Sequence, residues 1–432
     1  MTSAAATTPA APDAPVAPNP SADHSPRAST NGSAVSGPSA QPDGRRERSP
    51  SRSPRTQYLP DRPLVLGAGP AGLASACALH RRGIGPVVLE RAEAVCDSWR
   101  DRYEGLAINS TRRLSSLPWM QIDKSSGPWV ASQDLVNYTE RYARRFSPDI
   151  RFGHDILSVE REGGGWSVRT TCGDYWSPWV VFALGLNATA HMPQWNGAGE
   201  FTGQLIHARD YKQASAYRGN DVLVVGVGAS GTDIAVKLVE GGARRVWLSV
   251  RTPPLVMRRH LSTAVLSQII KQGRRPPRVL VDWSSIWIHR LMWGDMSRYG
   301  LATPTEGLAT GLDVRGHGST VDRGMMSAIR AGRIKVLQAV DRLDGDDVVL
   351  ANGARVQPDV VIAATGQRTD LRRLLGDLDV LQEDERPIVH GAATDPRAPG
   401  MHFIGYRLPA GQLLDMRFDA PAIARRLARV LR

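Results

Sequence analysis

Cysteine is scarce in this sequence of 432 residues. Cys77, Cys96 and Cys172 form no CxxC pair and show none of the spacings typical of metal ligands. The chain therefore has no local redox dithiol, and we expect no metal site. Because so few cysteines are typical of proteins in a reducing compartment, the composition predicts a cytoplasmic protein.

Long apolar runs are also absent. No run approaches the roughly 20 residues that a membrane-spanning helix needs, so we expect no transmembrane segment. Residues 1–60 hold 11 of the 30 prolines and consist otherwise mostly of alanine, serine and threonine. They lack the apolar stretch of an export signal, and they cannot bury enough apolar surface to offset the entropy of ordering. We predict that residues 1–60 form a disordered tail.

The basic residues are in excess but dispersed. There are 54 lysines and arginines against 42 acidic residues, which gives a net charge of +12. Arginine pairs such as Arg81-Arg82, Arg274-Arg275 and Arg425-Arg426 lie far apart in the chain. Since nucleic-acid grooves combine a basic stripe with interleaved aromatic side chains, we expect no nucleic-acid partner. A dispersed basic surface instead attracts small polyphosphate ligands.

The strongest positive signal is a glycine-rich turn near the N-terminus. An apolar strand at 63–66 leads into a GxGxxG turn from Gly67 to Gly72, and a helical stretch follows. The next strand, 86–90, ends at Glu90, which is 18 residues after Gly72. In this strand–turn–helix context the glycines let the backbone approach a pyrophosphate at a helix N-terminus.

A second turn of the same kind follows in the middle of the chain. The strand 221–225 precedes a GxGxxG turn from Gly226 to Gly231, and Arg251 lies 20 residues after Gly231. An acid at this spacing accepts hydrogen bonds from a ribose, whereas an arginine suits a 2′-phosphate. The two turns therefore predict an FAD site and an NADPH site.

The residues expected to bind these cofactors follow from the two motifs. For FAD they are Gly67, Gly69, Pro70, Ala71, Gly72, Glu90 and Arg91. For NADPH they are Gly226, Gly228, Ser230, Gly231 and Arg251, whose guanidinium would grip the 2′-phosphate in a bidentate manner.

The remaining pattern predicts an α/β fold with two dinucleotide-binding, Rossmann-like domains. Helical spacing marks 134–145 and a closing helix at 419–431. Further strands are expected at 156–160, 166–171, 179–184, 334–339, 347–350 and 359–364. The NADPH-binding domain, 216–325 with a helical insertion, is predicted to interrupt a discontinuous FAD-binding domain, 61–215 and 326–432.

An apolar stripe lies within the helical insertion. Its members fall near helical spacing and predict an amphipathic helix: Val279, Leu280, Trp283, Ile286, Trp287 and Leu291. A substrate channel and a membrane surface are two alternatives for its apolar face. Because such stripes more often pack inside a protein, we favour a position in the core.

A family resemblance rests on a further motif between the two turns. The stretch from Phe201 to Tyr211 reads FxGxxxHxxxY and resembles the fingerprint of class B flavin-containing monooxygenases, especially YUCCA-like members. Other matching pieces are Ser98-Trp99-Arg100, Leu117-Pro118, Gly294-Asp295, Tyr299-Gly300-Leu301, Ala364-Thr365-Gly366 and Phe403-Ile404-Gly405. The resemblance covers the chain from residue 63 to residue 431.

The resemblance implies a reaction and roles for particular residues. NADPH would reduce FAD, and the reduced flavin would react with O2 to give a C4a-(hydro)peroxide that oxygenates a small substrate at nitrogen, sulfur or a 2-oxo acid. Asn109 is the candidate catalytic residue, while Ser98, Trp99 and Gly366 are assigned to cofactor binding. His207 is interpreted as structural rather than as a general base.

The chain also departs from the family pattern. Tyr211 stands where Baeyer–Villiger relatives have tryptophan, which disfavours lactone formation. Cys96-Asp97 replaces small residues near the flavin, so Asp97 either alters the flavin environment or is a solvated loop residue, and we favour the latter. Ala183-Leu184-Gly185 replaces an ATG-like motif.

Two other functions remain open at this point. One is a Baeyer–Villiger monooxygenase, and the other is a non-catalytic FAD- and NADPH-binding sensor. The sequence leaves open the identity of the substrate, the role of the tail and the oligomeric state, a homodimer included.

Overall fold

The computed structural model describes residues 56–260, 277–315, 319–407 and 412–431. Most of the predicted disordered tail, 1–55, lies outside the described residues. Its last part does not behave as predicted, because β1 (Gln57–Tyr58) pairs in parallel with β7 (Gly173–Ser177). The fold therefore begins within the segment that we assigned to the tail.

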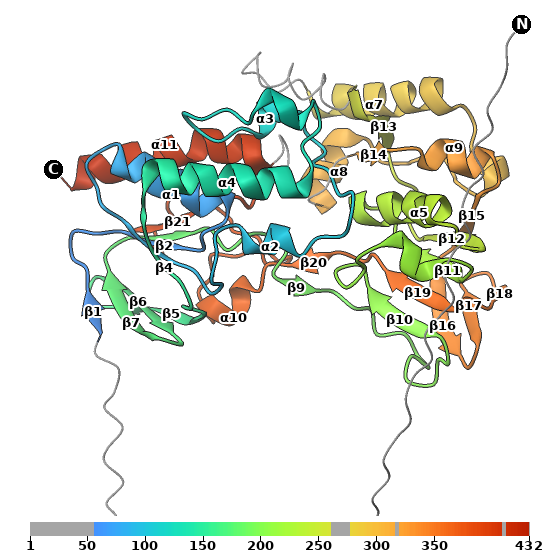
Figure 1. Ribbon diagram of the computed structural model, residues 1–432, viewed down its shortest axis with the longest axis horizontal. Helices are drawn as coiled ribbons and strands as arrows, with labels where there is room; N and C mark the ends of the chain where they lie inside the picture. The colour runs from blue at the N-terminus through green and yellow to red at the C-terminus, as the bar shows by residue number, and fades with distance from the viewer. Residues whose placement is uncertain (1–55, 261–276, 316–318, 408–411, 432) are drawn as a thin grey trace, which may run out of the picture. The chain divides into compact units, whose positions relative to one another are not determined.

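The first sheet has five parallel strands in the order β21-β8-β2-β3-β4 (Figure 1). In chain order they are β2 (Leu64–Leu66), β3 (Val87–Leu89), β4 (Asp149–Arg151), β8 (Val180–Phe182) and β21 (Met401–Phe403). The first glycine turn joins β2 to helix α1 (Pro70–His80), which confirms the predicted strand–turn–helix order.

Both faces of this sheet are buried, but by different elements. Val65 and Val88 lie in a core with helices α1, α4 (Ser132–Phe146) and α11 (Gln412–Val430). Their neighbours Leu64 and Leu66 point to the opposite face, into a core with α10 (Leu371–Leu375), β7, β5 (Ile156–Glu162) and β6 (Gly165–Thr170). Since both faces are covered, the strands are apolar throughout instead of alternating.

The second sheet is built in the same way around the second glycine turn. Its five parallel strands have the order β10-β19-β11-β12-β15. In chain order they are β10 (Gln204–His207), β11 (Asp221–Val225), β12 (Arg245–Val250), β15 (Ile334–Gln338) and β19 (Val360–Ala363). Helices α5 (Ala229–Gly241) and α9 (Met325–Arg330) cover one face.

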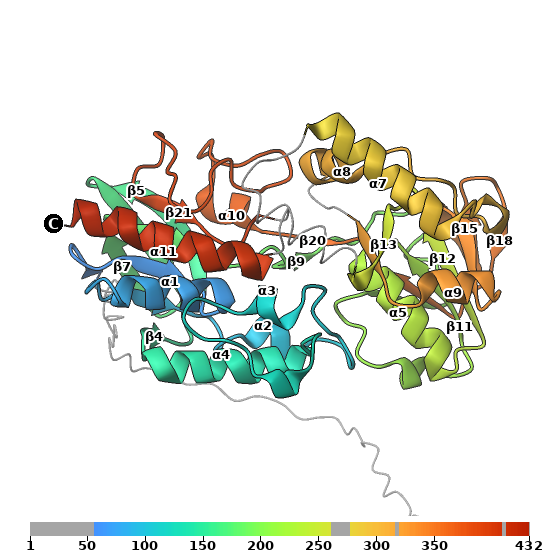
Figure 2. The same cartoon turned by 90° about the horizontal axis from the view of Figure 1, so that it is seen from above.

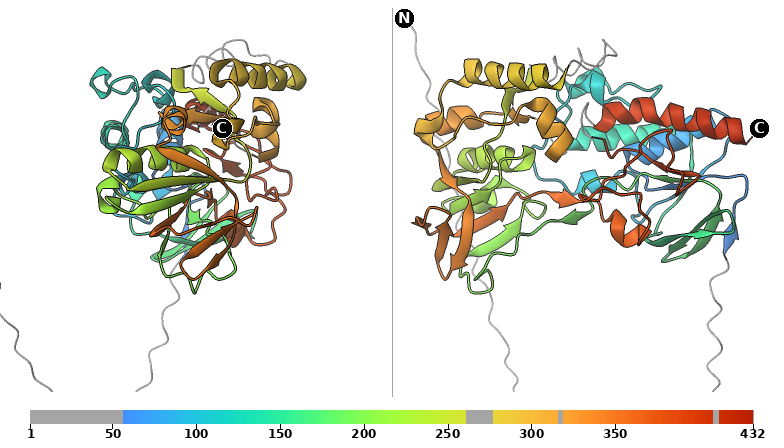
Figure 3. Two further views of the ribbon diagram at one scale, coloured as in Figure 1. Left: turned by 90° about the vertical axis from the view of Figure 1, so that its right-hand side faces the viewer. Right: turned by 180° about the vertical axis from the view of Figure 1, so that it is seen from behind.

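The opposite face of the second sheet carries a small antiparallel sheet (Figure 1, Figure 3). Its strands are β16 (Val340–Asp344), β17 (Asp347–Leu350) and β18 (Arg355–Val356). Leu223 and Trp247 of the large sheet pack there against Leu343 and Val348. Two further strand pairs are β9 (Thr189–Ala190) with β20 (Gln367–Arg368), and β13 (Val256–Arg258) with β14 (Thr320–Asp322).

Sheet membership corrects the strand assignment behind the predicted domain boundaries. The predicted NADPH-binding range, 216–325, leaves out β10, β15 and β19, yet all three belong to the sheet of the second turn. The reason is pairing between distant segments, such as β10 with β19, which local periodicity does not reveal. The division into one FAD-binding and one NADPH-binding domain stays a prediction.

The helix predicted in the insertion is present, but its predicted burial is wrong. Helix α7 (Arg278–Trp293) exposes Trp283 and Trp287 to solvent by 64% and 56%. Its opposite side packs against α8 (Leu308–Arg315), as Figure 2 shows. No described helix has the length and hydropathy needed to cross a membrane.

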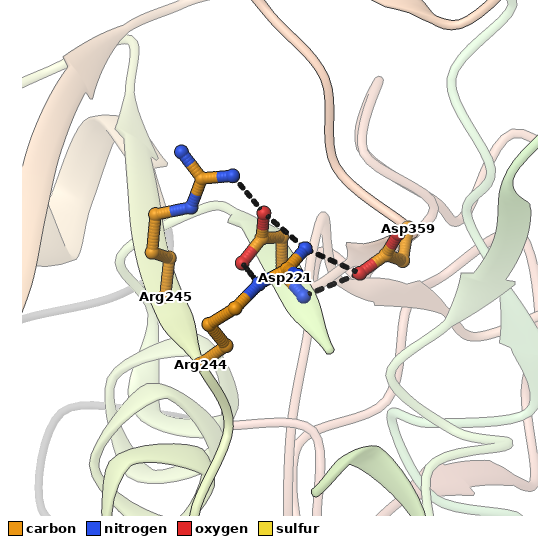
Figure 4. Close-up of polar contacts among 4 residues, drawn as sticks. All are labelled: Asp221, Arg244, Arg245 and Asp359. Atoms are coloured by element: carbon orange, nitrogen blue, oxygen red, sulfur yellow. Dashed lines mark hydrogen bonds and ion pairs between the residues drawn. The ribbon is translucent and has the colours of Figure 1, made fainter. Parts of the chain in front are cut away.

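A buried carboxylate lies at the amino-terminal end of β11, the central strand of the second sheet (Figure 4). Asp221 is 1% exposed and accepts hydrogen bonds from Arg244 Nε and Nη2, at 2.7 and 2.8 Å, and from Arg245. The backbone N–H of Asp221 donates to Asp359 Oδ2 at 2.7 Å. These bonds, those from Arg244 first, hold the pKa of Asp221 down at about 2.

We expect Asp221→Asn to lower the free energy of unfolding at pH 7 by about 1–3 kcal/mol, since two charge-assisted interactions are weakened. The lowered pKa means that Asp221 contributes fully above pH 4 and loses its contribution as the pH falls towards 2. Denaturant unfolding at pH 7 and pH 3 should therefore show a smaller difference between variant and native protein at pH 3.

The matched control is Asp341→Asn, which removes a carboxylate of an exposed ion pair with Arg342. It should change stability by less than about 0.5 kcal/mol at either pH. An effect of Asp221→Asn as small as that of the control would contradict the anchoring role.

Candidate active site

The first glycine turn leaves no room for a side chain where strand, turn and helix meet. A Cβ atom on Gly72 would lie 1.8 Å from the carbonyl oxygen of Gly67. Gly67 itself has a φ of +100°, and a Cβ there would lie 2.9 Å from the oxygen of Ala183. Helix α1 can therefore begin directly against the end of β2. A Cβ on Gly69, by contrast, would meet nothing within 4 Å.

The second turn repeats this geometry. A Cβ on Gly231 would lie 2.1 Å from the oxygen of Gly226, whereas one on Gly228 would meet nothing within 4 Å. Gly69 and Gly228 thus border open space at the N-termini of α1 and α5. Backbone N–H groups at a helix N-terminus carry partial positive charge, so both positions fit a pyrophosphate.

A cleft that is open to solvent extends from the first turn. The cleft brings together eight of the residues predicted to bind FAD: Gly67, Gly69, Pro70, Ala71, Glu90, Arg91, Ser98 and Trp99. Gly72 does not line it, because Gly72 packs against the turn.

The carboxylate of Glu90 stabilises the backbone beside this cleft by hydrogen bonding. Its Oε2 accepts a hydrogen bond of 2.6 Å from the N–H of Ala68, and its Oε1 accepts one of 3.0 Å from the N–H of Ala92. Glu90 follows directly after β3, at the carboxyl end of the sheet where α/β proteins bind ligands. A carboxylate accepts about four hydrogen bonds, so Glu90 retains capacity for a ribose hydroxyl.

A second cleft, of about 640 Å³, borders the second turn. It brings together Gly228, Ser230 and Gly366 from the predicted set, and Arg102 lines both clefts. Gly226 and Gly231 are excluded from its wall by their tight backbone contact. Arg251 does not line this cleft either; it follows the end of β12, and its side chain is exposed.

Asn109 is held by an arginine from the other half of the chain. Arg323 Nη2 donates to Asn109 Oδ1 at 2.8 Å and also donates to the carbonyl oxygen of Ala107. The same guanidinium forms an ion pair of 3.1 Å with Asp233 of α5, and both side chains are largely buried. The Tyr103 hydroxyl donates to Asp233 at 2.8 Å. Burial and this carboxylate raise the pKa of Tyr103, so it stays a protonated donor.

The arginine fixes the orientation of the Asn109 amide. A guanidinium group only donates hydrogen bonds, so Asn109 must turn its Oδ1 towards Arg323. The Nδ2 hydrogens of Asn109 then point away from Arg323 and can donate to an acceptor. The loop receives further support from Arg259, which donates to the oxygen of Ile108 at 2.5 Å and lies 3.9 Å from the ring centre of Trp129. Two guanidinium groups therefore flank the Asn109 loop.

His207 of the fingerprint has a structural geometry. The N–H of Arg209 donates to His207 Nδ1 at 3.1 Å, so the ring proton resides on Nε2, 3.0 Å from the oxygen of Gly366. Burial lowers the pKa of His207, which keeps the ring neutral. Both nitrogens are thus engaged, in agreement with the predicted structural role. Tyr211, at the end of the fingerprint, is buried between Tyr103 and Tyr217.

The departures near the first cleft have clear structural positions. Cys96 is buried with a φ of +60°, in the left-handed region that favours glycine, and burial raises its pKa to about 12. Its thiol therefore stays protonated. Asp97 begins the short helix α2 (Asp97–Arg100), is exposed and lines the cleft. Asp97 is thus solvated, as we favoured, and it also lies on the wall of the first cleft.

Sequence reasoning missed the groups that hold Asn109. Arg323 and Asn109 are 214 residues apart, and no motif marks either Arg323 or Asp233. Two features of the sequence were available, namely the position of Asp233 two residues after the second glycine turn and the arginines at 258 and 259. Neither identifies a partner without the fold. No cluster of metal-ligating side chains occurs in the part of the chain that the structure describes.

Comparison with known proteins identifies the family. The probable indole-3-pyruvate monooxygenase YUCCA8 of Arabidopsis thaliana is 31% identical over 320 residues, which cover 72% of this chain and 75% of that protein. The probable indole-3-pyruvate monooxygenase YUCCA4 of the same plant is 33% identical over 322 residues, 73% of this chain and 78% of the relative. The chain belongs to the class B flavin-containing monooxygenases.

The other comparisons agree with this assignment. Residues 64–273 match the pyridine nucleotide-disulphide oxidoreductase family. The solved flavin-containing monooxygenase from Stenotrophomonas maltophilia has the same fold, with a TM-score of 0.66 and 18% identity over 87% of this chain and all of that one. The protein is a flavin-dependent monooxygenase that uses FAD and NADPH, so the sensor alternative is not retained.

We expect Arg251→Ala to raise the dissociation constant of NADPH by about 10- to 100-fold, because a charge-assisted contact with the 2′-phosphate is lost. NADH lacks this phosphate, so its binding should change little. The measurement is a titration of both coenzymes, with Arg333→Ala as control, since Arg333 is an exposed arginine at the start of β15, away from the carboxyl end of the sheet. An equal loss for both coenzymes would contradict the assigned role.

Proposed function

We propose that this monooxygenase is NADPH-dependent and oxygenates a small substrate at nitrogen, sulfur or a 2-oxo acid, with 2-oxo acids as the first class to test. The observation that carries the proposal is the Asn109 loop, flanked by Arg259 and Arg323. These two cations suit an anionic substrate better than a neutral amine or ketone.

The cofactors would be held by the two glycine turns and by the residues predicted around them. Gly69 and the N-terminus of α1 would receive the FAD pyrophosphate, and Glu90 would bind the ribose. Gly228, Ser230 and Arg251 would hold NADPH. When bound, FAD would supply the oxygen chemistry that the family resemblance implies. The protein contributes orientation, electrostatics and exclusion of water.

Asn109 would orient an oxygen-bearing group by hydrogen bonding. Arg323 occupies the Oδ1 of Asn109, so the Nδ2 hydrogens are the ones presented to a ligand. An amide does not titrate, so this donor would be unaffected by pH. The carboxylate of Asp233 is paired with Arg323 and balances part of the positive charge near the loop.

The names of the relatives favour a 2-oxo acid within the proposed class. The plant proteins similar to this chain are named indole-3-pyruvate monooxygenases. Oxidative decarboxylation of such an acid consumes one O2, one NADPH and one proton. It yields the carboxylic acid shortened by one carbon, CO2, NADP⁺ and water. A carboxylate substrate would also benefit from the guanidinium groups beside Asn109.

A Baeyer–Villiger reaction is the second candidate. The fold resembles that of cyclohexanone monooxygenase, with a TM-score of 0.66, but at 16% identity this likeness concerns the fold alone. Tyr211, in place of the tryptophan of Baeyer–Villiger relatives, weighs against it. The buried ring of Tyr211 packs on Tyr103, whose hydroxyl contacts Asp233.

The test is a substrate panel of a 2-oxo acid, an amine, a thioether and a cyclic ketone, each supplied with NADPH and O2. We expect the 2-oxo acid to give CO2 and the shortened acid in near-equal amounts to the NADPH consumed. Formation of the lactone from the ketone would instead establish the Baeyer–Villiger alternative. NADPH oxidation that yields only hydrogen peroxide with all four substrates would overturn the proposed substrate class.

We expect Asn109→Ala to raise the hydrogen peroxide released per NADPH at least about tenfold, because a positioned donor worth about 1.4 kcal/mol or more is lost. Arg323→Met should act in the same direction, and Arg323→Lys should restore part of the coupling because it keeps a charge beside Asp233. Peroxide and product are quantified together, with FAD content as a check on folding. Asn137→Ala, on the exposed side of α4, is the control. Coupling unchanged in Asn109→Ala would remove Asn109 from the chemistry.

A further inference from the structure

Helix α7 turns its large apolar side chains outward. The exposed members are Val279 (77%), Leu280 (58%), Trp283 (64%), Trp287 (56%) and Leu291 (73%). At about 100° per residue they share one arc of roughly 120° on the helix. The two indole rings stack with centroids 6.4 Å apart. Contiguous exposed apolar side chains of this kind mark an interaction site far more often than scattered single ones do.

The opposite side of α7 is buried and mixes polar with apolar side chains. Ser285, His289 and Trp293 face the protein. Burial lowers the pKa of His289 to about 4, so the imidazole is neutral at physiological pH. The helix therefore differs from an ordinary surface helix, because five of its large apolar side chains are exposed while Ser285 and His289 are buried.

Specific polar contacts fix this orientation. Asp282 Oδ1 accepts hydrogen bonds from the N–H groups of Ala309 and Thr310, at 2.7 and 3.0 Å, at the start of α8. Asp282 Oδ2 accepts a bond of 2.6 Å from the Thr310 hydroxyl, and Ser285 Oγ accepts one from the N–H of Leu308. A rotation of α7 that buried the tryptophans would break all four bonds. The hydrogen bonds between α7 and the start of α8 therefore keep the apolar arc directed outward.

We propose that the arc of Val279, Leu280, Trp283, Trp287 and Leu291 docks onto the surface of an anionic lipid bilayer. The helix would lie in the plane of the membrane, with its apolar arc at the depth of the upper acyl chains and its cationic side chains among the headgroups. Tryptophan prefers this boundary, because its ring is largely apolar while its N–H remains hydrated. Figure 2, which looks onto α7, shows no described element covering this side.

Charge favours an anionic lipid surface over the other partners that could bind this face of α7. Arg290 is exposed and lies within the apolar arc, where its long side chain can extend to lipid phosphates. The carboxylate in α7, Asp282, is turned inward to α8. A second copy of the same face would bury two Arg290 side chains in a largely apolar contact, which costs desolvation. The net charge of +12 also favours an anionic surface.

The test is flotation of the FAD-loaded full-length protein with two kinds of vesicle, phosphatidylcholine alone and phosphatidylcholine with 30% phosphatidylglycerol. We expect binding to the anionic vesicles that weakens as salt rises from roughly 0.1 to 0.5 M, because screening shortens the range of the attraction. The double variant Trp283→Ser, Trp287→Ser should lower the partition coefficient by about tenfold or more per tryptophan.

The matched control is Trp119→Ser, which removes an exposed tryptophan outside α7. It should bind vesicles as the native protein does. FAD content and the rate of NADPH oxidation verify that each variant is folded, and neither depends on the outcome of the substrate panel. Quenching of native fluorescence by lipids brominated near the headgroup should be lost in the double variant and kept in the control.

Three outcomes would overturn the proposal. One is no binding to anionic vesicles, or binding that the double variant retains in full. Another is a dimer in sedimentation equilibrium that the double variant abolishes, since a second copy would then cover α7. The third is protection of Trp283 and Trp287 from acrylamide quenching in the lipid-free monomer, since the chain's own residues would then cover the helix.

Discussion

The whole arrangement depends on a close contact of two backbone segments that occurs twice. Gly72 lies so near the oxygen of Gly67, and Gly231 so near that of Gly226, that even a methyl group would overlap the preceding turn. This contact sets the first turn of each helix against the end of its strand and directs the free N–H groups of that turn outward. The middle glycine of each motif, Gly69 or Gly228, leaves space there. The open space that both clefts border at the N-termini of α1 and α5 follows from this constraint.

The second constraint is electrostatic and joins the two halves of the chain. Arg323 bridges Asp233, just after the second glycine turn, and Asn109, which lines neither of the two clefts. A buried guanidinium is costly unless its donors are used, and here they reach a carboxylate, an amide oxygen and a backbone carbonyl. The orientation of the Asn109 amide is therefore fixed by Arg323, which directly follows β14. A substitution at Asp233 would therefore change the orientation of Asn109 indirectly, because Arg323 contacts both residues.

Local sequence predicted much of the fold and only part of the site. The glycine turns, the helices α1, α4 and α7 and most strands were readable, because each is specified by residues within about 20 positions. We assigned too few strands to the sheet of the second turn, since β10 and β19 pair across more than a hundred residues. The role of Arg323 could not be predicted for the same reason, because its partner Asn109 lies 214 residues away in the chain. The periodicity of α7 was right but its buried side was wrong, because a pattern states which residues share a face and not what covers that face.

The outward face of α7 and the Asn109 loop share one support. Trp293, at the end of α7, donates its indole N–H to the oxygen of Val256 at 3.0 Å, and Arg330 donates to the backbone oxygen of Trp293. Val256 begins β13, and the chain leaves that strand at Arg259, which donates to the oxygen of Ile108 next to Asn109. The path from α7 to the Asn109 loop therefore contains one short strand and two hydrogen bonds. Because β13 is also paired with β14, close to Arg323, a displacement of α7 would act on both arginines that hold the loop.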